Sequence, residues 1–146
     1  LGLSQLRKLD GFLARRREIV AAYNAAFAHS GWLHVPGLRH PGDVATTSWH
    51  LYTVAIDFKR LGRTRTQVIK DLVAAGIGAH VLYIPVHLQP WYRSTYGYGP
   101  GKCPVAEAFY GQALSLPLYP AMTDADIVKV IDAVNALAPG QVRLSA

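Results

Sequence analysis

One stretch of the chain, residues 48–58, has the alternation of a β-strand with a single apolar face. It is rich in aromatic and β-branched residues, which favour strands. Every second position on one face is aromatic or apolar, apart from one histidine; these positions are His50, Tyr52, Val54, Ile56 and Phe58. A strand with one strongly apolar face needs a second layer to cover it, and amphipathic helices are the usual covering. The stretch therefore predicts a layered fold.

Helical patterns flank this strand on both sides. Thr64 or Thr66 can cap a helix that Gly76 ends, and Thr123 can cap another helix with Asp124 and Asp126 in its first turn. The apolar stripes expected on these two helices are Val68, Ile69, Leu72 and Val73, and Ile127, Val130, Ile131, Val134 and Leu137. Further strands are expected at residues 32–35, 78–84 and 115–118, a short helix at 105–113, and a long loop at 85–101.

This order of elements predicts an α+β fold with a small, largely antiparallel sheet packed by helices. With 146 residues, 51% hydrophobic and 16% charged, the chain is expected to form one small domain rather than a disordered segment. We divide it into a long helix at 1–28, an α+β core at 29–138 and a tail at 139–146. Leucines at helical spacing begin at the first residue with no capping residue before them, so we interpret this helix as cut from a longer one.

Composition excludes several classes of protein. Cys103 is the only cysteine, so neither an internal disulfide nor a cysteine-built zinc site is possible. No apolar stretch approaches the roughly 18 residues of a membrane span, and we expect a cytoplasmic protein with no membrane partner. The net charge of +6 allows two interpretations, an anion-binding surface or a simple surplus of surface cations. Because the basic groups are not interleaved with aromatic residues, we expect no nucleic-acid partner.

The residues most capable of binding a ligand lie at 83–93, just past a predicted strand end. Tyr83, His87, Gln89 and Arg93 surround two prolines that stiffen the backbone, in the kind of loop where ligand contacts concentrate. A packed aromatic loop with a structural histidine is the equally weighted alternative. His50 is a second candidate, again with a structural histidine as the alternative.

Other chemistry has little support. His50, His80 and His87 lack the helical spacing of a zinc-binding pair, so no metal site is expected. The chain contains neither a glycine-rich phosphate loop nor a GxSxG elbow. No complete catalytic apparatus is recognisable.

Several motifs appear in an order that points to a known family. They include Ser48-Trp49-His50-Leu51-Tyr52, Ala75-Gly76-Ile77-Gly78, residues 83–90 (YIPVHLQP) and residues 114–120 (LSLPLYP), besides residues 1–10 and 16–18. From residue 1 to about Leu137 the chain resembles the C-terminal part of the DegT/DnrJ/StrS family of pyridoxal-phosphate-dependent sugar-nucleotide aminotransferases. Residues 85–92 are most similar to members of the UDP-linked altrosamine transaminase type.

The resemblance implies the small C-terminal domain of a fold-type-I enzyme, usually a homodimer, whose large domain holds pyridoxal phosphate on a lysine. Such an enzyme moves an amino group, usually from glutamate, to a nucleotide-linked keto sugar. No lysine here matches the Schiff-base lysine, so we expect no catalytic residue, no bound cofactor and no activity from this chain alone. The resemblance assigns substrate contacts to His50, Tyr83, His87 and Gln89, while the residues that bind cofactor stay unknown.

The alternative function is a standalone, non-catalytic module that binds a partner through a basic surface and the tyrosine-rich loop. If the chain is instead an isolated small domain, an apolar patch around Leu3, Leu6 and residues 83–92 should be exposed and cause self-association.

Overall fold

A three-stranded antiparallel sheet lies at the centre of the computed structural model, which describes residues 2–40 and 42–138. Strand β2 (Tyr52–Ile56) lies between β1 (Leu33–His34) and β3 (Ala113–Leu116). In the register, Thr53 is opposite Ser115 and His34 is opposite Ala55. The predicted α+β fold with a small antiparallel sheet is confirmed.

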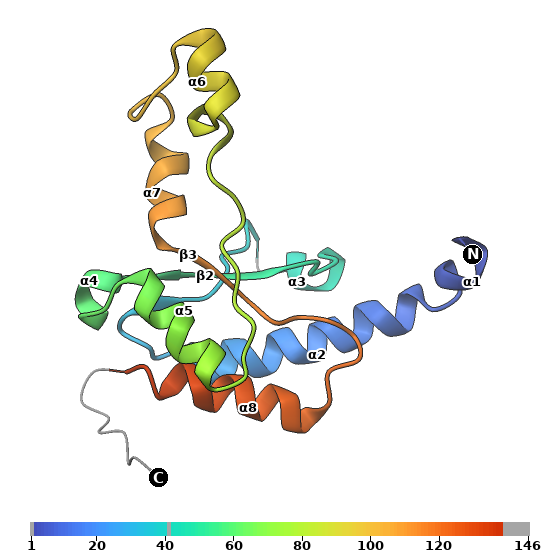
Figure 1. The fold of residues 1–146 in the computed structure, drawn as a ribbon. Coiled ribbons are helices and arrows are strands. Elements are labelled where there is room, and N and C mark those ends of the chain that lie inside the picture. Colours follow the sequence, from blue (N-terminus) through green and yellow to red (C-terminus); the bar gives the residue numbers. More distant parts are fainter. Residues whose placement is uncertain (1, 41, 139–146) are drawn as a thin grey trace.

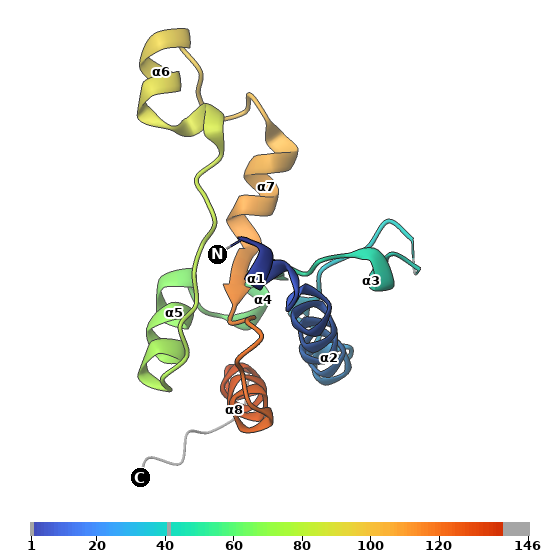
Figure 2. The same cartoon turned by 90° about the vertical axis from the view of Figure 1, so that its right-hand side faces the viewer.

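The helices are short except for α2, and most of them follow the strands closely. Their bounds are α1 Gly2–Leu6, α2 Leu9–Phe27, α3 Asp43–Thr46, α4 Phe58–Leu61, α5 Arg65–Ala74, the 3-10 turn η1 Val86–Leu88, α6 Pro90–Tyr96, α7 Pro104–Gln112 and α8 Asp124–Asn135. Figures 1 and 2 show α2, α5 and α8 on the side of the sheet that is opposite α6.

The hydrophobic core lies between the sheet and helices α2, α5 and α8. On β2 the buried residues are Tyr52, Val54 and Ile56, so the predicted apolar face of the strand points into the core. The helices contribute Ile19, Val20, Tyr23 and Phe27 from α2, Val68 and Leu72 from α5, and Ile127, Val130 and Val134 from α8. Val73, expected in the buried stripe of α5, is exposed instead.

The strand at β2 is shorter than the predicted 48–58. Trp49 has a left-handed φ of 49°, which interrupts the extended backbone before the strand. At the other end, the Asp57 side chain accepts a hydrogen bond from the Arg60 amide and starts α4. His50 and Phe58 therefore lie outside the strand.

The two predicted caps are confirmed by their hydrogen bonds. Thr64, rather than Thr66, caps α5 in a capping box with Gln67, and Thr123 caps α8 in the same way with Asp126. Gly76 ends α5 with a φ of 76°, a conformation that favours glycine. Lys129 Nζ would lie 2.9 Å from a Cβ atom at this position.

The expected continuous helix at 1–28 is instead two helices, α1 and α2, separated by a turn at Arg7 and Lys8. Leu3 and Leu6 are 75% and 64% exposed, so their stripe has no core to pack against in the described chain. Since tertiary packing supplies most helix stability, this stretch lacks the contacts that would hold one straight helix. Buried residues of α2 also extend the core beyond the predicted 29–138, whereas the tail 139–146 lies outside the described residues.

Two predictions between α5 and α7 were wrong. Residues 78–84 form no strand; only His80 bridges Ser115 at the outer edge of β3. The expected loop at 85–101 contains η1 and α6, with Pro90 in the first turn and Gly97 ending α6 at a φ of 66°. These elements are one or two turns long, too short to produce a helical period in the sequence.

Candidate functional site

Residues 83–112 form an arm that projects from the sheet, as Figure 1 shows. The arm rises from the chain after His80, turns at α6 and returns through α7 to β3. It carries three of the four predicted ligand-binding residues, Tyr83, His87 and Gln89, and it is therefore the first candidate site.

The centre of the arm is a hydrogen bond between His87 and Glu107. His87 is 7% exposed, and its Nε2 lies 2.8 Å from Glu107 Oε1. This contact joins η1 to α7 across twenty residues of chain. The sequence analysis singled out His87 but not Glu107; the available signal was an acidic residue in the first turn of a helix that begins at Pro104.

Backbone amides hold the Glu107 carboxylate in place. The Gly101 N–H donates to both carboxylate oxygens at 2.9 Å, and the Cys103 N–H donates to Oε1 at 3.2 Å. These donors, first Gly101 and then the His87 side chain, lower the pKa of Glu107 below its ordinary value, and partial burial opposes them. The carboxylate is thus ionised at neutral pH and acts only as an acceptor.

We expect the Glu107 contacts to contribute stability that depends on pH. Because folding lowers the pKa of this group, its contribution is complete above the unfolded pKa of about 4.3 and is lost as pH falls through the lower folded pKa. The measurement is urea unfolding at about pH 6 and about pH 3, and the NMR shift of the Gly101 amide follows the titration of Glu107 over the same range. The response should disappear in Glu107→Gln; an unchanged response in that variant would contradict the assignment.

The other two arm candidates differ in how they are held. Gln89 is half-buried and its side-chain amide donates to the Ile84 carbonyl at 3.2 Å, which closes the turn around η1. Tyr83 is 77% exposed, and its ring is free to contact another molecule. Within the arm, then, Tyr83 is available to a ligand, while Gln89 supports the backbone that carries His87.

The structure does not bring His50 to the arm. His80 pairs antiparallel with β3, so the chain that follows His80 runs in the same direction as β2. Thr53 and His80 both pair with Ser115. His50 precedes Thr53 and His87 follows His80, so the chain leads to the two histidines in opposite directions from these paired residues. His50 is exposed just before β2, and its carbonyl accepts from Arg16 Nη1 at 3.1 Å.

A cavity of about 470 Å³ lies near the His50 end of the sheet, between the segment after α5 and the start of α8. His80 and Leu51 line it together with residues of the LSLPLYP motif. Asp126 and Lys129, one turn apart on α8, supply its charged groups. The sequence analysis predicted this motif as part of a family pattern but did not predict a cavity beside it.

Aromatic side chains cover one face of α6. Trp91 contacts Tyr92 and Tyr96 edge to face, with ring centroids 4.9 and 5.6 Å apart, and Tyr96 stacks on Tyr98. Lys102 Nζ lies 4.8 Å from the Tyr98 ring centroid. Trp91 and Tyr96 are more than half exposed, as the predicted apolar patch requires. Figure 1 places α6 far from α1, so the patch is two separate areas.

Arginines expected on a basic surface are instead engaged within the fold. Arg16 Nη1 donates to the carbonyls of Trp49, His50 and Leu118. Arg15 donates to the Met122 carbonyl and to Asp124, and its pKa is raised by these carboxylate contacts with Asp124 and then Glu18. Arg15 and Arg16 therefore hold parts of the chain together, which favours the second interpretation of the +6 charge for these two residues.

The described residues do not fit pyridoxal phosphate by themselves. This cofactor needs a lysine whose amine is desolvated or activated, and all five lysines of the chain, Lys8, Lys59, Lys70, Lys102 and Lys129, are exposed. Within residues 2–40 and 42–138, no three His, Cys, Asp or Glu side chains are grouped to hold a metal ion. No helix in this part of the chain has the length and apolar character of a membrane span.

The chain is similar in sequence and in fold to known proteins. The chain is 41% identical to the spore coat polysaccharide biosynthesis protein SpsC of Bacillus subtilis, over 96% of this chain and 36% of SpsC. The PLP form of the putative sugar aminotransferase Spr1654 from Streptococcus pneumoniae superposes with a TM-score of 0.80 at 29% identity, over 93% of this chain and 33% of that one.

A third similar protein is Helicobacter pylori PseC, an aminotransferase involved in the biosynthesis of pseudoaminic acid. It superposes with a TM-score of 0.81 at 25% identity, over 93% of this chain and 35% of PseC. The chain thus spans about a third of the length of the proteins it matches. The DegT/DnrJ/EryC1/StrS aminotransferase family model matches residues 1–135. This chain belongs to the DegT/DnrJ/EryC1/StrS aminotransferase family.

Proposed function

We propose that this chain is the small C-terminal domain of a pyridoxal-phosphate-dependent sugar aminotransferase. The observation that carries the proposal is the family match over residues 1–135, combined with coverage of only about a third of each relative. The PLP form of Spr1654 and the polysaccharide-biosynthesis role of SpsC support the cofactor and the sugar substrate. The amino group passes from glutamate to a nucleotide-linked keto sugar.

Within this enzyme the chain binds and orients the sugar rather than breaking bonds. When bound, pyridoxal phosphate supplies the electron sink for the transfer. Because the five lysines here are exposed, the lysine that holds the cofactor belongs to another part of the enzyme, and this chain has no turnover alone. Tyr83 and His87 contact the substrate from the arm, Gln89 supports them, and His50 acts from the far end of the sheet.

The likeness to PseC supports a finer proposal, that the sugar is a UDP-linked keto sugar of the altrosamine type. We also propose a cytoplasmic homodimer, because the exposed apolar areas at α1 and on the arm need a covering surface. The standalone binding module has less support, since Arg15, Arg16 and Arg65 form internal hydrogen bonds instead of a free basic surface.

The test compares the chain with the full-length protein encoded by its source gene. Each is mixed with pyridoxal phosphate, glutamate and UDP- or TDP-linked keto sugars, and 2-oxoglutarate release is measured. We expect the full-length protein alone to release 2-oxoglutarate. We also expect it alone to retain, after desalting, a visible absorption from pyridoxal phosphate that depends on a lysine. Transfer by the chain alone, or an upstream sequence with no cofactor domain, would overturn the proposal.

A further inference from the structure

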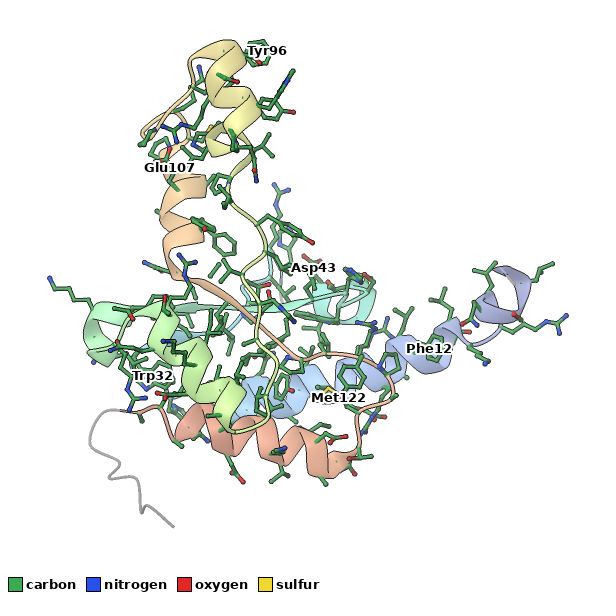
Figure 3. The ribbon with its side chains drawn as sticks, in the orientation of Figure 1. Phe12, Trp32, Asp43, Tyr96, Glu107 and Met122 are labelled. Carbon is green, nitrogen blue, oxygen red and sulfur yellow. The ribbon has the colours of Figure 1, made fainter. Side chains whose placement is uncertain are left out.

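His87 is held by one side-chain hydrogen bond. It is one of two buried polar residues in the described part of the chain, and the other, Ser115, lies in the sheet. Its Nε2 lies 2.8 Å from Glu107 Oε1, and the side-chain exposures are 8% for His87 and 22% for Glu107. Figure 3 shows Glu107 at the end of α7 next to α6, where the arm folds back on itself.

The partner in this pair is a fixed acceptor. Three hydrogen bonds from the backbone amides of Gly101 and Cys103 orient the Glu107 carboxylate independently of His87. An ionised carboxylate has no proton to donate. The hydrogen atom between Glu107 and His87 must therefore belong to Nε2 of the imidazole ring.

The other ring nitrogen, Nδ1, is left open. No residue in the described part of the chain forms a hydrogen bond with it. A fully buried Nδ1 would then be a buried polar atom without a partner. In the described residues the atoms of that kind are Arg17 Nε and Ser30 Oγ, and Nδ1 is not one of them. Nδ1 therefore reaches the molecular surface. In a neutral ring with a proton on Nε2, Nδ1 is an acceptor.

We propose that Glu107 is a positioning residue that holds the His87 ring with its proton on Nε2 and presents Nδ1 as a hydrogen-bond acceptor. The donor that fits this nitrogen is a hydroxyl of the sugar substrate. Only this last assignment rests on the proposed function, while the orientation of the ring follows from the contacts within the arm. Glu107 acts through His87 and needs no contact with substrate itself.

The first experiment reads the protonation of the ring directly. Long-range proton–nitrogen NMR spectra of the chain at about pH 8, above the ordinary histidine pKa, distinguish the two tautomers. We expect His87 almost entirely as the Nε2–H form. In Glu107→Ala this preference should be lost, because no acceptor then faces Nε2. Glu18→Ala, which removes a carboxylate in an ion pair with Arg15 on α2, is the matched control and should change nothing.

Two results would overturn the proposal. One is a His87 ring that carries its proton on Nδ1, or on both nitrogens, in the unaltered chain. This measurement does not depend on the folding of any variant. The other is an Nε2–H preference that persists in Glu107→Ala while the amide spectrum shows a native fold.

The second experiment uses the full-length enzyme. We expect Glu107→Ala to raise KM for the keto sugar about ten-fold, the loss of one oriented hydrogen bond, with kcat changed less than about two-fold. KM for glutamate should stay constant, whereas a general structural defect would move both values. If the unaltered enzyme transfers no amino group, the proposed function fails; the NMR result then still decides the role of Glu107.

Discussion

Replacing Tyr52 by alanine is expected to lower the free energy of unfolding of the 146-residue chain by about 3 to 5 kcal/mol. Tyr52 is fully buried at the start of β2, and its ring lies 5.0 Å from that of Tyr23 on α2. Its hydroxyl donates to Asn24 Oδ1 at 2.8 Å. Burial raises the pKa of Tyr52, so the hydroxyl stays protonated and the donor role holds at every pH used for unfolding.

Urea unfolding followed by circular dichroism measures this effect, with Tyr52→Phe as the matched control. The phenylalanine keeps the ring and removes only the hydroxyl, so a loss of about 1 kcal/mol is expected. The difference between the two variants separates ring packing from the hydrogen bond. A loss below about 1 kcal/mol for alanine would show that this ring is not central to the core.

Replacing Arg16 by methionine is the second large change, with an expected loss of about 2 to 3 kcal/mol. One guanidinium nitrogen of Arg16 donates to three carbonyls, at 2.9 Å for Trp49, 3.1 Å for His50 and 3.2 Å for Leu118. These carbonyls come from two segments that flank the sheet, so Arg16 ties both to α2. Methionine keeps most of the apolar stem and removes every donor.

The controls for Arg16 are chosen to separate charge from geometry. Arg7→Met removes the same charge from an exposed position in the turn before α2 and should cost less than about 0.5 kcal/mol. Arg16→Lys keeps the charge but lacks the planar fork, so we expect an intermediate loss. Equal stability of Arg16→Met and Arg7→Met in thermal unfolding would contradict the claim that Arg16 links these two segments to α2.

Local patterns predicted some elements well. The capping boxes at Thr64 and Thr123 require contacts only within one helical turn, and both form at the residues predicted as helix caps. The same holds for Gly76, whose positive φ ends α5, and for the alternation that buries Tyr52 and Val54. Each signal and its structural partner lie within a few residues of each other, so no tertiary information is needed.

Other elements depended on contacts that sequence periodicity does not contain. Residues 78–84 have the composition of a strand, yet only His80 reaches the edge of β3, because the chain then leaves the sheet to form the arm. Leu3 and Leu6 repeat at helical spacing but pack on nothing described, and the helix breaks after them. In both cases the missing information is which surface is available to cover the segment.

The candidate site divides in the same way. The segment with Tyr83, His87 and Gln89 was predictable as a ligand-binding candidate because its residue types are concentrated between two prolines. Glu107 was not, since its link to His87 spans the whole of α6 and forms only when the arm folds back. His50 lies outside this segment, just before β2, and its place relative to the arm depends on strand direction, which no local motif encodes.

The sequence by itself determined the α+β class, the two capped helices and the family, because all three rest on residue types at short, fixed spacings. Only the tertiary structure decided how these parts act together. It turned Arg16 inward onto three carbonyls, separated His50 from the arm and set Glu107 against His87. Each of these depends on the distance in space between residues far apart in the chain, which is a property of the folded packing and not of the order of residues.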